Sequence, residues 1–206
     1  MLKKFLTTQS LFILFFSTAL GEEAQFLSNV RQLTFEGRRA GEGYFGPSGN
    51  LMVLQSEREA DNPFYQIYLM DFETGDVERI SPGYGKTTCS WIHPNQQEVL
   101  FASTHSNPEA RNKQKEELAF RASGKERRYS WDYDESFELY LYDRKSKNYR
   151  QLTNSIGYDA EAAISPDGNW IVFSSNRLAY SKPMSDVDRK IFENDKAFMV
   201  DIYKMR

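Results

Sequence analysis

Residues 165–175 read Ser-Pro-Asp-Gly-Asn-Trp-Ile-Val-Phe-Ser-Ser, a tight turn followed at once by a run of β-favouring residues. In such a turn Pro166 fixes φ and removes a backbone donor, Asp167 can bond its own backbone, and Gly168 can adopt a positive φ. The segment therefore predicts a β-hairpin whose second strand follows the turn directly.

The same pattern occurs twice more in the chain. Pro47 and Gly49 stand in a turn before residues 51–56, and Pro94 stands in a turn before residues 98–103. The three turn prolines are 47 and then 72 residues apart, so the second interval contains an insertion. Internal repetition at about 40 to 50 residues is typical of β-propellers, which have four strands in each repeated sheet, or blade.

Further strands follow from the same alignment. Segments 66–71, 138–143 and 200–205 alternate in polarity, which is typical of strands with one buried face. Segments 77–81 and 149–153 follow polar turns and complete two hairpins. The strands of the expected blades occupy about 30–34, 41–81, 88–153 and 160–206.

The third copy gives the most specific indication of a family. It contains, in order, Gln-Leu-Thr, Gly-Tyr-Asp, Ser-Pro-Asp-Gly, Ile-Val-Phe-Ser-Ser-Asn-Arg and Asp-Ile-Tyr at residues 151–153, 157–159, 165–168, 171–177 and 201–203. That order is similar to the WD40-like β-propeller repeat of the TolB type, over about residues 30–206. The first copy departs from the repeat at Ser48 and the second at residues 95–97. The resemblance implies an all-β fold, here a partial β-propeller of about three four-stranded antiparallel blades with short helical insertions.

The number of copies is too small for a closed ring, because propellers typically close with at least four blades. Two complete units are present, with a third that reaches its third strand, and residues 30–34 resemble an outermost strand without a preceding blade. We therefore expect this sequence to be part of a longer propeller chain. The alternative is self-association of several copies through open sheet edges, which pair readily with other chains.

The first 21 residues have the composition of a secretory signal peptide. Lys3 and Lys4 precede the apolar run 11–16, and small residues at 19–21 predict cleavage before Glu22. The run is short for a membrane-spanning helix, and retention as an uncleaved anchor is the alternative. No later segment of the sequence is long and apolar enough to span a bilayer. The prediction is a periplasmic or secreted protein.

Composition indicates a globular domain and argues against nucleic acid as a partner. The chain is 40% hydrophobic and 27% charged, with a formal net charge of −3. Loss of Lys3 and Lys4 with the signal peptide leaves 24 basic against 29 acidic residues, a charge of −5, which is unsuited to a phosphate backbone. The single cysteine, Cys89, is expected to be a small buried hydrophobe rather than a catalytic thiol.

Two insertions separate the second and third strands of their units, at about 104–136 and 178–199. Residues 113–120 of the first are good helix formers, and Ser185 in the second is placed as a helix N-cap. Insertions at equivalent positions fall on one face of a propeller, and loops on a rigid scaffold tend to carry function. We therefore expect a partner-binding surface there.

The candidate contacts for a protein or peptide partner in the cell envelope are Arg127, Arg128, Trp131 and Asp159. The first three lie in a basic and aromatic stretch of the first insertion. Asp159 precedes the innermost strand of the third unit, near the expected mouth of the channel. The resemblance alternatively implies a structural role for this aspartate, in bonding the turn that follows.

Clustered carboxylates raise a metal-binding alternative. Asp132, Asp134 and Glu135 could supply the oxygen ligands that calcium prefers. The glycine of an EF-hand loop is absent, and a solvated acidic loop beside Arg127 and Arg128 explains the same residues. We therefore expect no cofactor.

Catalytic chemistry has little support in the sequence. His93 lies in a repeat turn where the third copy has serine, and His105 lies in an insertion without an evident nucleophile. The sequence has no Gly-x-Ser-x-Gly elbow and no pair of histidines at zinc-ligand spacing. No catalytic residue is predicted.

Two main classes of function remain open. The first is a non-catalytic exported propeller that binds a protein, peptide or cell-envelope component, as the resemblance implies. The second is the N-terminal propeller of a serine hydrolase similar to the prolyl oligopeptidase and dipeptidyl peptidase families, with its catalytic domain outside this chain. A weaker third is a carbohydrate-active propeller enzyme similar to oligogalacturonate lyases. Sequence beyond Arg206 distinguishes the first two, because an elbow motif followed by Asp and His would establish the hydrolase.

Overall fold

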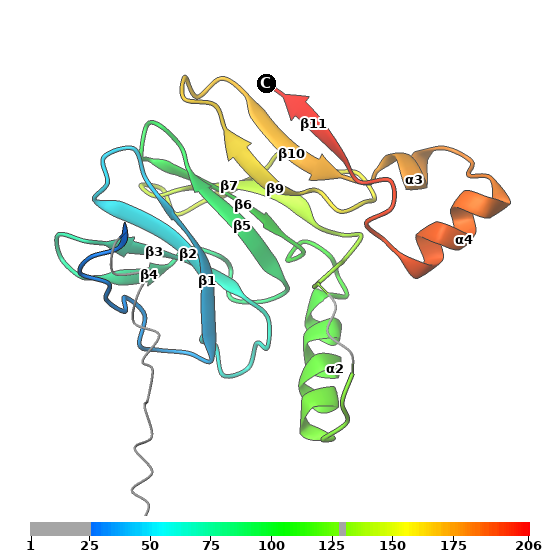
Figure 1. Cartoon of the computed structure of the whole chain (residues 1–206), viewed down its shortest axis with the longest axis horizontal. Helices are drawn as coiled ribbons and strands as arrows, with labels where there is room; N and C mark the ends of the chain where they lie inside the picture. Colours follow the sequence, from blue (N-terminus) through cyan, green and yellow to red (C-terminus); the bar gives the residue numbers. More distant parts are fainter. Residues whose placement is uncertain (1–25, 128–130) are drawn as a thin grey trace, which may run out of the picture. The chain divides into compact units, whose positions relative to one another are not determined.

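The computed structural model describes residues 26–127 and 131–206 of the chain. The predicted signal peptide, residues 1–21, lies outside these ranges. Residues 36–206 form one compact unit, and residues up to Phe35 belong to a separate one. Within the described ranges the larger unit is built from three antiparallel sheets and a few helices (Figure 1). The predicted all-β partial propeller is therefore confirmed.

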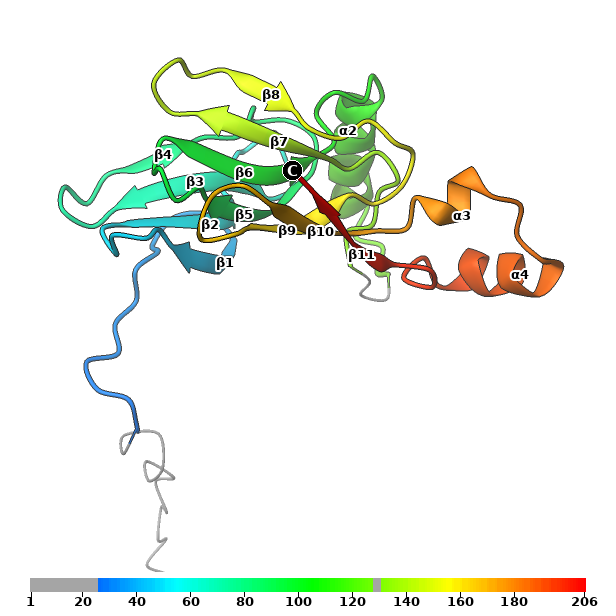
Figure 2. The same cartoon turned by 90° about the horizontal axis from the view of Figure 1, so that it is seen from above.

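Each sheet is one blade, and its strands pair in chain order. Blade 1 comprises β1 (Arg39–Phe45), β2 (Leu51–Glu57), β3 (Gln66–Asp71) and β4 (Val77–Arg79). Blade 2 comprises β5 (Thr87–Ile92), β6 (Glu98–Ser103), β7 (Glu138–Asp143) and β8 (Tyr149–Gln151). Blade 3 comprises β9 (Ala160–Ile164), β10 (Ile171–Ser175) and β11 (Asp201–Met205). The first strands β1, β5 and β9 are the innermost and lie side by side (Figures 1 and 2).

The three repeat turns close in the same way. Gly49 and Gly168 adopt φ of 77° and 74°, and each donates its N–H to the carbonyl three residues earlier. Gln96 stands at the equivalent position of the second turn with φ of 57°. Its N–H donates to His93 O at 2.8 Å, so this turn is closed in the same way. The left-handed backbone conformation is strained at Gln96, because the residue has a side chain and glycine does not.

Apolar faces join neighbouring blades, and β6 contributes to two cores. Val99 and Phe101 of β6 belong to the core shared with blade 1. Leu100 and Ala102 of the same strand belong to the core shared with blade 3. Successive side chains of a strand point to opposite faces, so this strand is buried on both sides. Blade 2 is therefore held between its two neighbours.

The strand expected at residues 30–34 is not formed. The segment has no regular secondary structure, and its Val30 and Leu33 side chains are exposed. The local sequence favours a strand, but an outermost strand exists only by hydrogen bonding to the third strand of its own blade. No described strand pairs with this segment, so the prediction was wrong.

Both insertions join the second strand of a blade to its third. The first contains α2 (Ala110–Ala122), and the second contains α3 (Leu178–Ser181) and α4 (Asp186–Asn194). The helices extend away from the sheets, with α4 far from blade 1 (Figures 1 and 2). The N-cap predicted at Ser185 is confirmed, because its Oγ accepts a hydrogen bond from Asp188 N at 3.1 Å. Within the described ranges, every helix is too short or too polar to cross a membrane.

The first residue of the third strand is a glutamine in blade 1 and a glutamate in blade 2. The glutamine, Gln66, is fully bonded: its Oε1 accepts from Ser81 Oγ at 2.7 Å and Gly83 N at 2.9 Å, and its Nε2 donates to Gly85 O at 3.0 Å. Because it is completely buried, this amide fixes the chain that leads from one blade to the next.

The glutamate, Glu138, lacks the donor that the amide supplies. Its Oε1 accepts from Ser155 N at 2.9 Å, but its Oε2 is buried without a partner among the described residues. Burial raises the pKa of Glu138 to about 7, and the charge of Asp159 acts in the same direction. The nearby Thr153 hydroxyl, the hydrogen bond from Ser155 N and the charge of Arg177 oppose these effects and do not cancel them.

We expect Gln96→Gly to raise the free energy of unfolding by about 1 kcal/mol, because glycine adopts a positive φ without a side-chain clash. The hydrogen bond that Gln96 Oε1 accepts from Ser48 Oγ is exposed, and its loss should cost little. Urea denaturation followed by circular dichroism measures the difference. In the control Gly168→Gln the protein should lose stability, because a Cβ there would lie 2.9 Å from His93 Cε1. Equal or lower stability of Gln96→Gly contradicts the strain argument.

Glu138→Gln should stabilise the protein in alkaline but not in acidic solution. The folded-state pKa, about 7, lies above the usual 4.5, so folding favours the protonated carboxyl. The stability linked to this group is complete below about pH 4.5 and is lost as the pH rises through about 7. The variant should therefore gain about 3 kcal/mol over the parent at about pH 8 and almost nothing at about pH 4.5. Unfolding free energies at both pH values test this, with Gln66→Glu as the reciprocal control, and a difference that does not change with pH refutes it.

Candidate functional site

The innermost strands carry a β-bulge at one equivalent position in each blade. Register shifts interrupt the pairing of β1 with β2, of β5 with β6 and of β9 with β10. At these shifts Glu42, Cys89 and Glu161 have left-handed backbones, with φ of 50°, 47° and 53°. Bulges re-aim side chains and are common beside binding sites. All three residues line one cavity.

This cavity has a volume of about 750 Å³ and is bordered by β1, β2, β5 and the first insertion. Aromatic side chains in its wall are Phe64, Tyr65, Phe120, Trp131, Phe137 and Tyr158. Basic side chains are Arg38, Arg39, Lys86, Arg121 and Arg127. Acidic side chains are Glu42, Glu57, Glu117, Asp132 and Glu161. The wall therefore combines flat apolar surfaces with groups of both charges.

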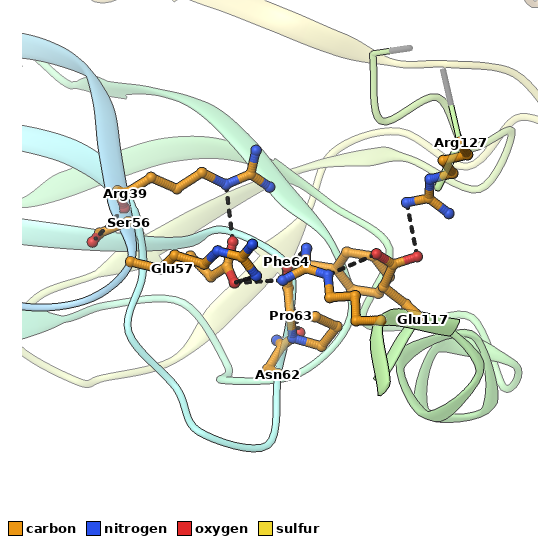
Figure 3. Close-up of polar contacts among 10 residues, drawn as sticks. Arg39, Ser56, Glu57, Asn62, Pro63, Phe64, Glu117 and Arg127 are labelled. Carbon is orange, nitrogen blue, oxygen red and sulfur yellow. Dashed lines mark hydrogen bonds and ion pairs between the residues drawn. The ribbon is translucent and has the colours of Figure 1, made fainter. Parts of the chain in front are cut away.

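Glu57, at the end of β2, is the centre of an ion network in the cavity wall (Figure 3). Its Oε2 accepts from Arg39 Nε at 2.9 Å, and its Oε1 accepts from Arg121 Nη1 at 2.6 Å. Arg38 Nη1 lies 3.9 Å from the same carboxylate. Because Glu57 is buried, these guanidinium groups are what make a charge tolerable at this position.

Arg121 extends the network from blade 1 into α2. Its Nε donates to Glu117 Oε1 at 2.8 Å, and its Nη2 donates to Pro63 O at 2.8 Å. Arg127 Nη2 lies 2.8 Å from the other oxygen of Glu117 (Figure 3). Burial alone would raise the pKa of Glu117, but the hydrogen bonds from Arg121 and Arg127 outweigh burial and lower it. Both buried glutamates are therefore held by arginines.

Polar contacts hold α2 in place. Gln114 Nε2 donates to Asp61 O, and Lys113 Nζ lies 2.9 Å from both carboxylate oxygens of Asp134. The buried residues of this helix include one apolar side chain, Ala110. The position of α2 therefore depends on hydrogen bonds and charge more than on an apolar core.

Two of the residues predicted as partner contacts line the cavity. These are Arg127 and Trp131, and the Trp131 ring packs edge to face on Tyr158 with the centroids 4.6 Å apart. Arg128 lies outside the described residues.

Asp159 lies in the interior, at the start of blade 3. Its side chain is completely buried, accepts a hydrogen bond from Ser175 Oγ and is ion-paired with Arg177. Burial outweighs these contacts and raises the pKa of Asp159. The carboxyl therefore ties the first strand of the blade to the end of the second, and is not presented to a partner.

The structure does not bring the predicted calcium ligands together as one set. Asp134 is buried and paired with Lys113, whereas Glu135 Oε2 accepts a hydrogen bond from Tyr180 OH at 3.1 Å. Asp132 lines the cavity. In the described part of the chain, no three acidic, histidine or cysteine residues are placed to hold a metal ion. Asp134 and Glu135 are therefore engaged by lysine and tyrosine side chains.

His105 lies beside a serine, with its Nδ1 3.0 Å from Ser103 Oγ. The other two blades have a serine at the equivalent position, because Ser56, Ser103 and Ser175 have the same spacing as the three turn prolines. In Ser56–Arg58 and in Ser175–Arg177, the arginine Nε donates to the serine Oγ at 3.1 Å. Arginine cannot act as a base. The serine–histidine pair is therefore the blade 2 form of a repeated structural contact, and burial lowers the pKa of His105 to about 4.

The structure also explains the other two residues considered for catalysis, His93 and Cys89. His93 Nδ1 accepts a hydrogen bond from Asn95 N at 3.0 Å within its turn. Cys89 is half-buried in the cavity wall, and burial, reinforced by the charges of Glu42 and Glu161, raises the pKa of its thiol to about 12. The thiol is therefore protonated at neutral pH and is a poor nucleophile.

The sequence did not predict the ion network of Arg39, Glu57 and Arg121 in the cavity wall. Arg39 and Glu57 are 18 residues apart, and Arg121 is 64 residues from Glu57. The one available signal is the spacing of Glu117 and Arg121, because residues four apart on a helix can pair. That spacing predicts an ion pair on one helix, but not its partners on blade 1.

No family model matches the chain. Comparison of sequences finds several curated relatives. Among them, a protein of Bacillus subtilis (strain 168) named Uncharacterized peptidase YuxL is 24% identical to this chain over 151 residues. The match covers 68% of this chain and 22% of the other protein, so the chain spans about a fifth of the length of that relative.

Comparison of structures finds TolB proteins among a larger number of matches. TolB of Agrobacterium tumefaciens matches with a TM-score of 0.52 at 16% identity, over 84% of this chain and 47% of that one. TolB of Acinetobacter baumannii matches with a TM-score of 0.45 at 21% identity, over 68% of this chain and 27% of that one. The first match shows the fold: the blades are those of part of a TolB-like β-propeller.

Replacement of Arg121 by methionine should loosen α2. The change removes three hydrogen bonds, to Glu57, Glu117 and Pro63, and should lower the free energy of opening of the helix by about 2 kcal/mol. Hydrogen exchange of the α2 amides measures this loss. The control Lys115→Met, at an exposed position of the same helix, should leave exchange unchanged. Equal protection of α2 in Arg121→Met and the parent would show that the helix is held by other contacts.

Proposed function

We propose that this chain is an exported, non-catalytic propeller segment that binds a peptide stretch of a protein partner in the cell envelope. The binding site is the cavity bordered by β1, β5 and the first insertion. The observation that carries the proposal is the cavity itself. Its volume of about 750 Å³ lies within the range of small-ligand sites, and its wall mixes aromatic rings with a few polar groups.

The wall has the groups that an extended peptide needs. Phe120 and Trp131, which are partly exposed, offer flat apolar surfaces for peptide side chains. The arginines bring donors for peptide carbonyl groups. The relative in Bacillus subtilis is named a peptidase, and peptides are the molecules on which a peptidase acts.

A binding role without catalysis is supported by how the reactive groups are used. His105 and Ser103 form a contact that recurs with arginine in the other blades. The thiol of Cys89 is protonated at neutral pH because burial raises its pKa. Export to the periplasm or the exterior rests on the composition of residues 1–21 and on the TolB-type repeat.

A second function is favoured by the sequence match. The relative named as a peptidase is much longer than this chain, which spans 22% of it. In this alternative the blades admit peptides to a catalytic domain of a longer serine hydrolase. Sequence beyond Arg206 decides between the two, because the hydrolase requires a Gly-x-Ser-x-Gly elbow followed by Asp and His. Further repeats without that motif support the binding function.

Peptide binding can be tested by selecting phage-displayed random peptides on the immobilised exported chain and titrating synthetic copies by calorimetry. Gly41→Trp should weaken binding at least about tenfold, because Gly41 lines the cavity and a Cβ added there meets no atom within 4 Å. The control Lys145→Trp places the same ring in the turn between β7 and β8 and should bind as the parent does. If no peptide is enriched, the proposed function is wrong. If peptides bind Gly41→Trp as tightly as the parent, the site is wrong.

A further inference from the structure

The ion network in the cavity wall contains more arginines than carboxylates. Glu57 and Glu117 are its two buried acids, and each has both oxygens within 2.9 Å of an arginine nitrogen. The arginines are four: Arg38, Arg39, Arg121 and Arg127. Two carboxylates cannot neutralise four guanidinium groups, so the network has a surplus of two positive charges.

Two arginines at the cavity surface, Arg39 and Arg127, have N–H groups that make no hydrogen bond to another described residue. Arg121 uses its Nε and both terminal nitrogens on Glu117, Glu57 and Pro63. Arg39 uses its Nε on Glu57, and neither terminal nitrogen makes a hydrogen bond to another described residue. Arg127 contacts Glu117 through Nη2 alone among the described residues. The side chains of Arg39 and Arg127 are 40% and 55% exposed, so their remaining N–H groups can reach a ligand.

Aromatic rings hold these two guanidinium groups in position. The Arg39 group lies over the Tyr65 ring, 4.4 Å from its centroid, and the Arg127 group lies over the Phe120 ring at 4.8 Å. Each arginine is thus fixed on one side by a glutamate and below by a ring. A guanidinium that is already oriented loses little conformational entropy when it binds a carboxylate with two parallel hydrogen bonds.

The cavity wall also contains Glu42, Asp132 and Glu161, and none of them forms an ion pair with these arginines among the described residues. Glu161 Oε2 accepts a hydrogen bond from Ser174 Oγ at 2.9 Å. Lys86 Nζ donates to Tyr133 O at 3.0 Å. Among the described residues, the ion pairs of Arg39 and Arg127 are therefore those with Glu57 and Glu117.

We infer that the cavity recognises a carboxylate of its peptide ligand through Arg39 and Arg127. The inference rests on the proposed peptide-binding function and adds the chemistry of recognition to it. A peptide can supply the carboxylate from its C-terminus or from an Asp or Glu side chain. The geometry requires the charge and the planar pair of oxygens that both sources share.

Three sets of octapeptides, random in Ala, Ser, Phe and Tyr and labelled at the N-terminus with a fluorophore that carries no carboxylate, test the inference with the exported chain. The first set has a free C-terminus, the second a C-terminal amide, and the third an amide and one central glutamate. Fluorescence anisotropy should show at least one carboxylate-bearing set binding about tenfold more tightly than the amide set, and which set does so identifies the source. Equal binding of all three sets overturns the inference and leaves the proposed function standing. Binding by none refutes both.

Variants of the two arginines test the assignment. Arg39→Met and Arg127→Met should each reduce the preference for carboxylate several-fold and leave binding of the amide set unchanged. The control Arg150→Met removes an exposed arginine of β8 and should keep the full preference. A preference that persists in both cavity variants overturns the assignment of these residues. Comparison of the peptide sets on the parent protein does not depend on whether the variants fold.

Discussion

The blades of this protein depend on one another because β6, the second strand of blade 2, buries its two faces against two different blades. Val99 and Phe101 of this strand lie in the core shared with blade 1, and Leu100 and Ala102 lie in the core shared with blade 3. Blade 2 cannot cover both of these faces by itself. A strand with apolar side chains on both faces thus requires sheets to stack on either side of it. This stacking places β1, β5 and β9 side by side, with the cavity next to them.

What the sequence predicts well is what depends on neighbours along the chain. The turns, the alternating strands and the N-cap at Ser185 follow from residues a few positions apart, and the predicted fold is confirmed. The strand expected at 30–34 fails because its pairing partner is not among the described strands. The ion network around Glu57 was not predictable because its members are 18 to 64 residues apart and belong to different elements. Propensity and spacing contain no information about which side chains meet across a cavity.

Repetition also separates structural from functional side chains. Ser103 with His105 resembles part of a catalytic arrangement when it is considered alone. Its equivalents in the other blades, Ser56–Arg58 and Ser175–Arg177, make the same contact with a residue that cannot accept a proton. The arginine network is the reverse case, because Glu57 and Arg39 have no acidic and basic counterparts joined in this way in the described parts of blades 2 and 3. Such departure from the repeat supports the proposal that the cavity is a binding site.

The bulges on the innermost strands have a consequence for how this surface can vary. Glu42, Cys89 and Glu161 share one backbone conformation with three different local sequences, so strand pairing and not side-chain identity sets the bend. Each residue accepts a left-handed geometry that costs about 1–2 kcal/mol relative to glycine. Side chains at these three positions can therefore be exchanged without changing the backbone of the blades. The chemistry of the cavity lining can vary while the fold stays the same.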